Sequence, residues 1–259
     1  MKYLLYILAI AISLSSCSNT YYYSTLNTND EGVGRDKTGT FIFETDTIQL
    51  AYSFRGQDGP IKISIHNKLD RPMYVDWSKS AIIINDVATS YHGEKSFVEG
   101  GLNSYRSAKT TSGYEYNPDY ISFVPPFRKV EHCSLWLSNL NFDNIDKKEY
   151  GKGTMSNIFN QKVNVKELNF SETNTPLFFE SYLTIFLEDG STYAISQSFY
   201  ISNLIRAKNI TPAELSQELS QKNNLMFTVV KANNTGWQAF AIGSLIVGAT
   251  VLDAAFNSY

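Results

Sequence analysis

His132 and Cys133 are neighbouring residues whose types could support nucleophilic catalysis. A histidine activates a cysteine by taking the thiol proton, which requires the two side chains to lie within hydrogen-bond distance. Residues 130–137 alternate in the manner of a β-strand, in which adjacent side chains point to opposite faces. We therefore predict that this pair shares no proton and that Cys133 is a small buried core residue.

The three histidines, His66, His92 and His132, offer donor atoms for zinc, but their spacing is not that of a zinc site. The sequence also contains no G-x-S-x-G elbow, H-E-x-x-H helix, phosphate-binding loop or dinucleotide fingerprint. Because no set of residues has the roles that a reaction requires, we predict no catalytic residue, no metal ligand and no cofactor.

The composition excludes several classes of protein. The 259 residues include 22 Lys and Arg against 25 Asp and Glu, a net charge of -3. There is no basic cluster along the sequence, which argues against nucleic-acid binding. A hydrophobic share of 43 % is too high for a disordered chain, and two cysteines cannot form a disulfide framework. The 17 Tyr and 16 Phe favour strands.

Two pairs of alternating segments predict β-hairpins. Residues 47–54 and 61–65 alternate between apolar and polar on either side of a turn. Residues 182–187 and 192–196 do the same around Asp189-Gly190, which is a favoured turn pair. Further alternating or apolar runs predict about eight to ten strands in all, with regular turns between them.

These strands predict one domain over residues 40–232. The fold class is mainly β, an immunoglobulin-like or related antiparallel β-sandwich. Thr211, Pro212 and Glu214 have the types of a capped helix start, so we expect one short helix near 211–222. Residues 225–230 read as the last strand.

Two long polar stretches interrupt the strands, at residues 93–119 and 138–161. Long loops in compact domains are often functional. The first is rich in Tyr, Ser, Gly and Asn, which are common at recognition surfaces. Such loops are also ordinary insertions, and this is the interpretation we favour; the alternative is a binding surface in which Tyr105, Tyr114 and Tyr116 face a ligand.

The N-terminus has the pattern of an export signal. Lys2 precedes an apolar run over residues 3–14, and this run is too short to span a membrane. The following Leu-Ser-Ser-Cys sequence, which ends at Cys17, resembles the bacterial lipobox. That resemblance implies cleavage between Ser16 and Cys17, and lipidation of Cys17 by a diacylglycerol and further acyl chains. Residues 1–16 are then a signal peptide, and the lipid anchors the protein to a membrane.

Residues 17–39 are rich in Ser, Asn, Thr and Gly, and we expect a flexible tether with a span of about 25 Å. The three tyrosines at 21–23 fit the lipid headgroup region. In the lipoproteins that the motif resembles, an Asp after the cysteine retains the protein in the inner membrane and acidic residues direct it to the cell surface. Ser18 stands there, and the first acids are Asp30 and Glu31. The resemblance implies the outer membrane, at its periplasmic face rather than the cell surface.

Residues 65–80, which read IHNKLDRPMYVDWSKS, resemble a segment of uncharacterised Bacteroidota outer-membrane-type lipoproteins. In that family an N-K-x-D-x-P-x-Y-V-D-W-x-K-S run connects two strands. The resemblance implies a lipid-anchored sandwich and brings no established activity. We expect Trp77 and Trp136 to fill the core, and Asp76 to be a turn or edge carboxylate rather than a ligand-binding group.

Thr47 lies in a short Asp-Thr-Ile pattern. This pattern resembles the O-glycosylation motif of Bacteroidota, so Thr47 is a possible glycosylation site. The alternative is that Thr47 simply begins a strand.

Residues 237–256 form an apolar tail that we expect to be a helix. It is just long enough to span a bilayer, but Asp253 falls within it. Its small residues favour packing against another helix. The tail therefore has three alternative roles: membrane association, contact with another helix, or packing in the core of the domain.

The leading hypothesis from the sequence is a non-catalytic envelope lipoprotein that binds an unknown protein partner or supports cell-envelope assembly. One alternative is a fimbrial or adhesin-type structural module, in which the aromatic N-terminal segment and the apolar tail act as exchanged elements. The other is a glycan-binding or glycan-processing lipoprotein.

Overall fold

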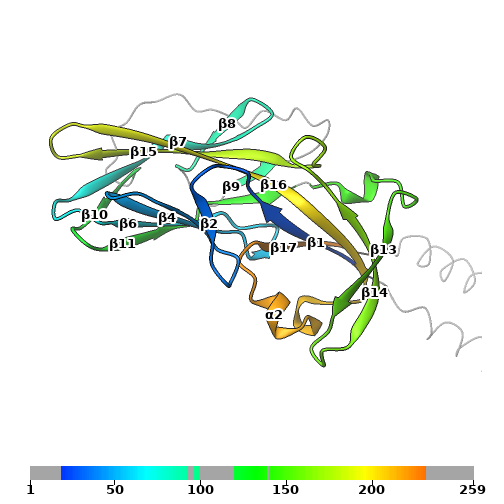
Figure 1. The fold of residues 1–259 in the computed structure, drawn as a ribbon. Coiled ribbons are helices and arrows are strands. Elements are labelled where there is room, and N and C mark those ends of the chain that lie inside the picture. Colours follow the sequence, from blue (N-terminus) through cyan, green and yellow to red (C-terminus); the bar gives the residue numbers. More distant parts are fainter. Residues whose placement is uncertain (1–18, 93–95, 100–119, 139, 232–259) are drawn as a thin grey trace, which may run out of the picture. The chain divides into compact units, whose positions relative to one another are not determined.

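Figure 1 shows the computed structural model, which describes residues 19–92, 96–99, 120–138 and 140–231. The chain divides into two compact units, Tyr21–Val229 and a second one made of Met1–Thr20 and Val230–Tyr259. Nearly all of the second unit lies outside the described residues. Also outside them lie Ser16, Cys17, Tyr105, Tyr114, Tyr116 and the apolar tail at 237–256.

The described residues of the first unit are mainly β and form three sheets. The largest follows the order β10-β7-β15-β16-β1-β17-β5, with β8 beside β7, β14 beside β16 and β13 beside β14. Its strands are β1 (Thr20–Asn27), β5 (Gly56–Gln57), β7 (Met73–Ile84), β8 (Val87–Ser90), β10 (Ile121–Val124), β13 (Gly151–Ser156), β14 (Lys162–Asn169), β15 (Phe178–Leu187), β16 (Thr192–Lys208) and β17 (Leu225–Val230).

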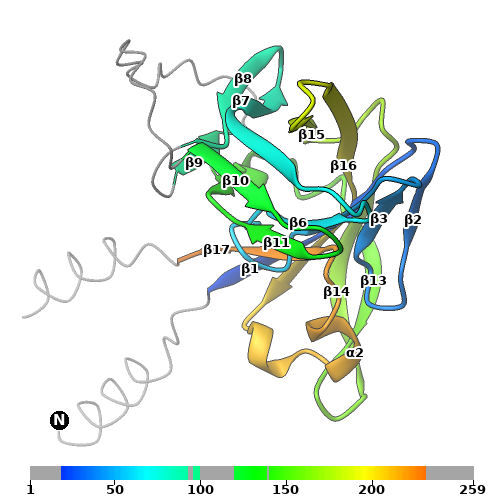
Figure 2. The ribbon, with the colours of Figure 1, turned by 90° about the vertical axis from the view of Figure 1, so that its left-hand side faces the viewer.

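The second sheet follows the order β11-β6-β4-β3-β2. Its strands are β2 (Val33–Arg35), β3 (Phe41–Glu44), β4 (Ile48–Ser53), β6 (Lys62–Asn67) and β11 (Lys129–His132). A third, two-stranded sheet pairs β9 (Ser96–Glu99) with β12 (Leu135–Ser138) in parallel. In Figure 2, β7, β15 and β16 lie above β6 and β11.

Side chains from the two larger sheets share one core, which gives the unit a sandwich-like construction. At its centre, the ring of Phe199 on β16 lies 5.0–5.4 Å from the rings of Phe41, Phe54 and Phe179. These rings come from both sheets and meet partly edge to face, a favourable arrangement for buried aromatic groups.

Both predicted hairpins are confirmed. Strands β4 and β6 pair antiparallel, with Leu50 opposite Ile65. Strands β15 and β16 pair from Phe186 opposite Thr192, and Gly190 in the turn between them has φ +81°. The predicted last strand is β17, with the predicted bounds. These elements depend on local alternation and turn residues, which the sequence displays directly.

The prediction of a flexible tether over residues 17–39 is wrong for the described part of that segment. Residues 20–27 form β1, which lies between β16 and β17 in the large sheet. Tyr22 and Leu26 join the main core, and Tyr23 joins a second cluster on the other face of the strand. Because these side chains are at most 1 % exposed, Tyr22 and Tyr23 do not stand at the lipid surface.

The predicted long connection at 138–161 is also partly structured. It contains a short 3-10 helix, η2 (Phe142–Asn144), and strand β13. In the other predicted loop, 93–119, residues 96–99 form β9, and residues 100–119 lie outside the described part of the chain.

The helix near 211–222 is shorter than predicted. The capping box between Thr211 and Glu214 is present, but it starts only a 3-10 helix, η3 (Pro212–Glu214). Leu215 is extended and 5 % exposed because it packs into the second cluster, and α2 (Gln217–Ser220) begins anew after Ser216. Over the described ranges, no helix is long and apolar enough to cross a membrane.

Candidate functional site

His132, at the end of β11, stacks on Trp77 inside the sandwich. The two rings are 13° from parallel, with centroids 3.8 Å apart. The Trp77 side chain is 2 % exposed, and its indole nitrogen donates a hydrogen bond to Ser122 Oγ at 2.8 Å. Trp77 therefore belongs to the core, and the His132 ring packs against one face of its indole.

Ser134 forms a pair with His132 that resembles a nucleophile and its base. His132 Nε2 lies 2.9 Å from Ser134 Oγ, but the serine hydroxyl donates its own proton to the carbonyl oxygen of Tyr91 at 2.6 Å. The Ser134 oxygen must then accept from Nε2–H, so Nε2 has no lone pair with which to take the serine proton. This arrangement connects structural elements and does not activate a nucleophile.

The burial of His132 predicts a pH dependence of stability. Burial lowers the pKa of its imidazole, against a smaller opposite effect of the Tyr91 carbonyl. In the unfolded chain the group titrates near pH 6.5, so below that pH the unfolded state binds more protons than the folded state. The free energy of unfolding should therefore be fully retained above about pH 6.5 and fall as the pH drops towards the lowered pKa.

Urea unfolding between about pH 7 and pH 5 tests this dependence. His132→Gln should flatten the slope, whereas His66→Gln on the neighbouring strand β6 should leave it in place. An unchanged slope in His132→Gln would contradict the assignment.

Hydrogen bonds among the hydroxyl groups of Tyr52, Tyr91 and Ser181 connect the two larger sheets. Ser181 Oγ on β15 lies 2.8 Å from Tyr91 Oη and 3.1 Å from Tyr52 Oη on β4. All three residues are at most 1 % exposed, and burial raises the pKa of both phenols above the usual range. Both phenols therefore stay protonated, and the chain of hydrogen bonds holds the sheets in register.

Residues Asp76–Ser80 form a bulge in β7. Residues 77–80 stand opposite Leu183 alone, because Asp76 pairs with Thr184 while Ala81 pairs with Tyr182. Ser80 Oγ bridges the break: it donates to the Asp76 carbonyl at 2.6 Å and accepts from the Thr184 amide at 2.9 Å. Bulges of this kind bend a strand and direct its side chains.

The Asp76 carboxylate accepts hydrogen bonds from backbone amides within the same bulge. It accepts bonds from the backbone amides of Ser78 and Lys79 at 3.1 and 3.2 Å, and its side chain is 8 % exposed. It is therefore a turn carboxylate, which explains the residue type without a ligand.

Two predicted core residues are less buried than expected. Cys133 and Trp136 are only partly buried, since Cys133 follows the end of β11 and β12 lies in the small sheet. Thr47 is also partly exposed just before β4, with its Oγ1 3.1 Å from Thr45 Oγ1. Within the described residues, no group of His, Cys, Asp or Glu side chains could hold a metal ion.

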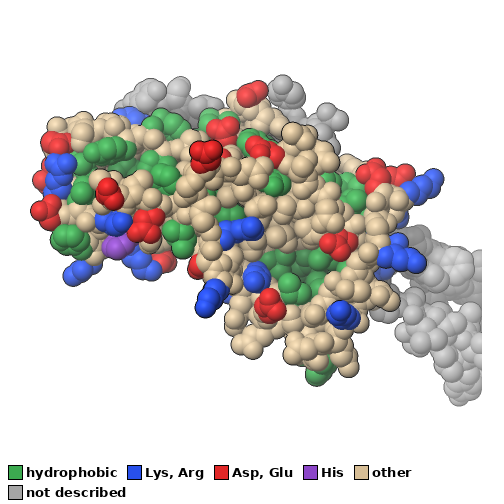
Figure 3. All heavy atoms as spheres, in the orientation of Figure 1, with side chains coloured by type: hydrophobic (Ala, Val, Ile, Leu, Met, Phe, Trp, Pro, Cys, Tyr) green, Lys and Arg blue, Asp and Glu red, His purple; other side chains and the backbone are tan. Residues whose placement is uncertain are grey.

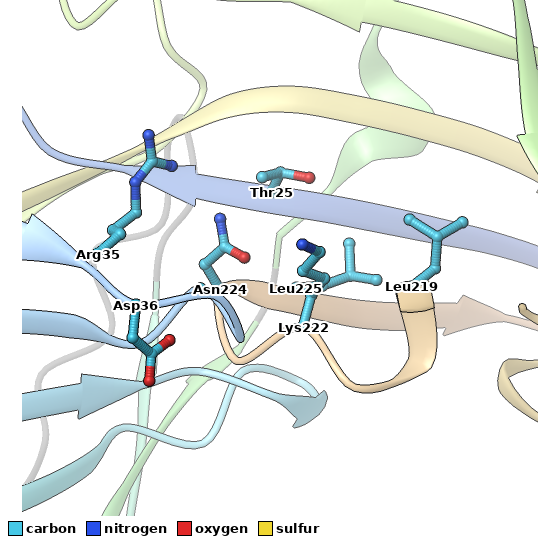
Figure 4. A pocket seen from close by; sticks show the side chains of 8 residues that line it. Thr25, Arg35, Asp36, Leu219, Lys222, Asn224 and Leu225 are labelled. Atoms are coloured by element: carbon cyan, nitrogen blue, oxygen red, sulfur yellow. The ribbon is translucent and has the colours of Figure 1, made fainter. Parts of the chain in front are cut away.

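A hollow of about 290 Å³ lies between β1, the loop after β2, and α2 (Figure 4). Two of its polar side chains, Asp36 and Asn224, are already bonded within the fold. Asp36 accepts three hydrogen bonds from Thr38 and Thr40, and these lower the pKa of its carboxyl although burial acts to raise it. Asn224 donates to the Leu26 carbonyl at 3.1 Å. These two side chains are therefore used by the fold itself.

The first unit begins with β1 and ends with β17, and these two strands are neighbours in the large sheet. Leu26 N donates to Asn224 O at 2.9 Å, and the rings of Tyr23 and Phe227 lie 6.2 Å apart. These contacts show that β1 and β17 run antiparallel, so the start of β1 lies beside the end of β17. The end of β16 lies there too, because Tyr23 Oη donates to Ile210 O at 2.6 Å.

Three aromatic rings form a ladder across the outer face of the large sheet. Tyr74 on β7 stands between Phe123 on β10 and Phe186 on β15, in direct cross-strand register. The centroids are 5.5 Å apart for Tyr74 and Phe123, and 5.1 Å for Tyr74 and Phe186. Phe123 is 52 % exposed, and an Arg71–Asp189 ion pair of 2.7 Å joins the two turns next to the ladder. Figure 3 shows hydrophobic side chains gathered over this end of β7 and β15.

Comparison with protein families, curated proteins and solved structures finds no match. The aromatic ladder and the shared end of β1, β16 and β17 are therefore the features from which a function can be inferred. Sequence reasoning missed Tyr74, Phe123 and Phe186 as a group. Each is an ordinary strand residue, and only the register of three strands brings them together.

Proposed function

We propose that this protein is a non-catalytic lipoprotein of the bacterial cell envelope whose sandwich domain binds a protein partner through the aromatic ladder. In this proposal a lipid on Cys17 anchors the chain in the outer membrane at its periplasmic face. The domain is a sandwich of the immunoglobulin-like or a related type. The observation that carries the binding proposal is the ladder of Tyr74, Phe123 and Phe186 with its flanking ion pair, in which Phe123 is exposed and Tyr74 and Phe186 are partly exposed and stacked on each other.

The ladder has the composition of an interface centre. Interface hot spots are enriched in aromatic residues surrounded by polar groups, and stacked rings lose little side-chain entropy on binding. Exposed apolar surface costs solubility, so a contiguous aromatic strip on a sheet face favours a binding role.

The start of β1 supports a close anchor. Thr20 follows Cys17 by three residues, which span at most about 10 Å. The proposed lipid would therefore hold the domain close to the membrane, without the longer tether expected from composition. The proposed helix at 237–256 would follow the end of β17 on the neighbouring strand and add a second membrane or helix–helix contact.

The ladder is about 45 Å along β16 from the anchored end. Phe186 stands opposite Thr192 at the start of β16, and Arg206 is near the end of this 17-residue strand. Fourteen residues of strand at about 3.3 Å each give this separation. The ladder would thus face away from the membrane, where a partner can reach it.

Site-specific photo-crosslinking in cells tests this function. A photoreactive phenylalanine at position 123 should give a discrete adduct with one envelope protein. The matched control is position 159, where Phe159 is 75 % exposed but lies in the β13–β14 turn. Equal adducts at both positions, or none at position 123, would contradict the proposal. Labelling with a palmitate analogue should be lost in Cys17→Ser.

Glycan binding is a second candidate, because the exposed ring of Phe123 offers an apolar surface on which a sugar can pack. A glycan array with the full chain separates the two candidates. Binding that disappears in Tyr74→Ala would favour the glycan.

A fimbrial or adhesin-type module is a third candidate, favoured by one observation. The N-terminal strand β1 lies in the interior of the large sheet, so its exchange between copies would leave a complete sheet in each. Ladders of oligomers in native membranes would favour this function.

A further inference from the structure

Four basic side chains gather where β13, β14 and β16 lie side by side. Lys152, Lys166, Arg206 and Lys208 line an open hollow of about 750 Å³, together with Asn164. The chain as a whole has a net charge of -3, so this concentration of positive charge is local. Figure 3 shows Lys and Arg side chains at the right-hand edge of the molecule, where Figure 1 places β13 and β14.

The strand register places these cations so close together that they lower the stability of the folded sheet. Lys152 stands directly opposite Lys166, and Lys166 stands directly opposite Arg206, so three like charges form a row across three strands. Like charges in direct cross-strand positions destabilise a sheet. None of these cations forms an ion pair with a carboxylate in the described part of the chain. Departures from local stability rules of this kind are typical of functional sites.

Arg206 is held in place by a buried phenol. Its Nε donates to Tyr22 Oη at 3.2 Å, and Tyr22 in turn donates to Asp143 Oδ1 at 2.5 Å. Burial and the hydrogen bond with Asp143 raise the pKa of Tyr22 to about 12, so the phenol stays neutral. With Nε engaged, the two terminal amino groups of the guanidinium remain for an anion, and they match a phosphate in a forked geometry.

We propose that Lys152, Lys166, Arg206 and Lys208 form a binding site for the phosphate group of an anionic ligand. The hollow lies beside the start of β1, and β1 follows the proposed lipid anchor. The assignment of the ligand to a lipid headgroup therefore rests on the proposed function. A soluble phosphate compound would meet the same four cations, so the experiment has one arm for each source.

The first arm uses the full chain in non-ionic detergent and inorganic pyrophosphate as the probe. Acetylation of lysines, followed by mass spectrometry, should show protection of Lys152, Lys166 and Lys208 by pyrophosphate. Chloride at equal ionic strength should give no protection. Lys166→Gln should weaken pyrophosphate binding about tenfold, the effect of losing one charge-assisted hydrogen bond. Lys129→Gln, an equal charge change on β11, should leave it unchanged.

Stability gives an independent readout. If Lys166 is present for binding, Lys166→Gln should unfold at the same or a higher urea concentration, because the like-charge row is broken. A lysine with a purely structural role would give the reverse, lower stability and unchanged binding, and that result would overturn the proposal.

The second arm places the full chain in nanodiscs of phosphatidylcholine, with or without phosphatidylglycerol. Protection of the three lysines by phosphatidylglycerol alone supports a lipid headgroup, and protection by pyrophosphate alone supports a soluble phosphate. Absence of protection in both arms overturns the site. The pyrophosphate arm needs no lipid on Cys17, so it tests the site even where the proposed anchor fails.

Discussion

Leu26→Asp is expected to prevent the domain from folding. Leu26 is 0 % exposed in the interior of the large sheet. Its backbone amide donates to the carbonyl of Asn224, the residue just before β17, and its carbonyl accepts from the Asn224 side-chain amide. An ionised carboxylate at this position would be buried without a partner, which costs several kcal/mol, a large part of the stability of a typical domain. Circular dichroism and limited proteolysis of the full chain in detergent should show loss of the β structure.

The matched control is Lys37→Asp, an exposed position in the same N-terminal segment. It should leave the fold intact. If Leu26→Asp also folds with unchanged stability, residues 20–27 are a tether and not a core strand. That result would also contradict the proposed short distance between the anchor and the domain.

Trp77→Ala is expected to lower the free energy of unfolding by about 3–5 kcal/mol, the usual cost of truncating a buried large aromatic residue. The substitution removes the stacking partner of His132 and the hydrogen bond to Ser122, and it leaves a cavity beside the β7 bulge. Urea unfolding of the full chain in non-ionic detergent measures the loss.

Trp77→Phe is the milder variant, because it keeps one aromatic ring in the core but loses the indole donor and part of the buried area. We expect it to cost more than the roughly 1 kcal/mol of the hydrogen bond and less than Trp77→Ala. A loss below about 1 kcal/mol in Trp77→Ala would mean that the residue does not fill the core.

The sequence allowed prediction of elements whose signal is local. The hairpin at Asp189-Gly190 combines a turn pair with alternation on both sides, and the last strand combines an apolar run with a preceding polar turn. The capping box at Thr211 was likewise visible, but the length of its helix was not. Burial of Leu215 in the second cluster ends that helix, and this is a tertiary effect.

Strand β1 could not be predicted because both of its faces are covered. Tyr22 and Tyr23, which are adjacent, enter two different clusters, so no alternation between apolar and polar residues remains. Its Ser, Asn and Thr residues then resemble a linker. The pairing that orders it joins residues about 200 positions apart, beyond any local pattern.

The basic hollow was hidden for the same reason. Lys152, Lys166 and Arg206 lie on three strands and form no basic run, so composition argued only against an extended anionic partner such as a nucleic acid. Cross-strand register brings them into one row. The rings of Tyr74, Phe123 and Phe186 are joined in the same way, which is why neither feature was recognised from the sequence.

The proposed orientation puts the end of β16 near the membrane and the aromatic ladder away from it, and a depth measurement distinguishes this orientation from the others. A Cys133→Ser chain would carry a fluorophore on either Lys208→Cys or Glu188→Cys, both exposed positions near opposite ends of the large sheet. In nanodiscs with a quencher on the lipid headgroups, we predict strong quenching at position 208 and little at position 188. Equal quenching at both positions, or stronger quenching at 188, would contradict the proposed anchoring.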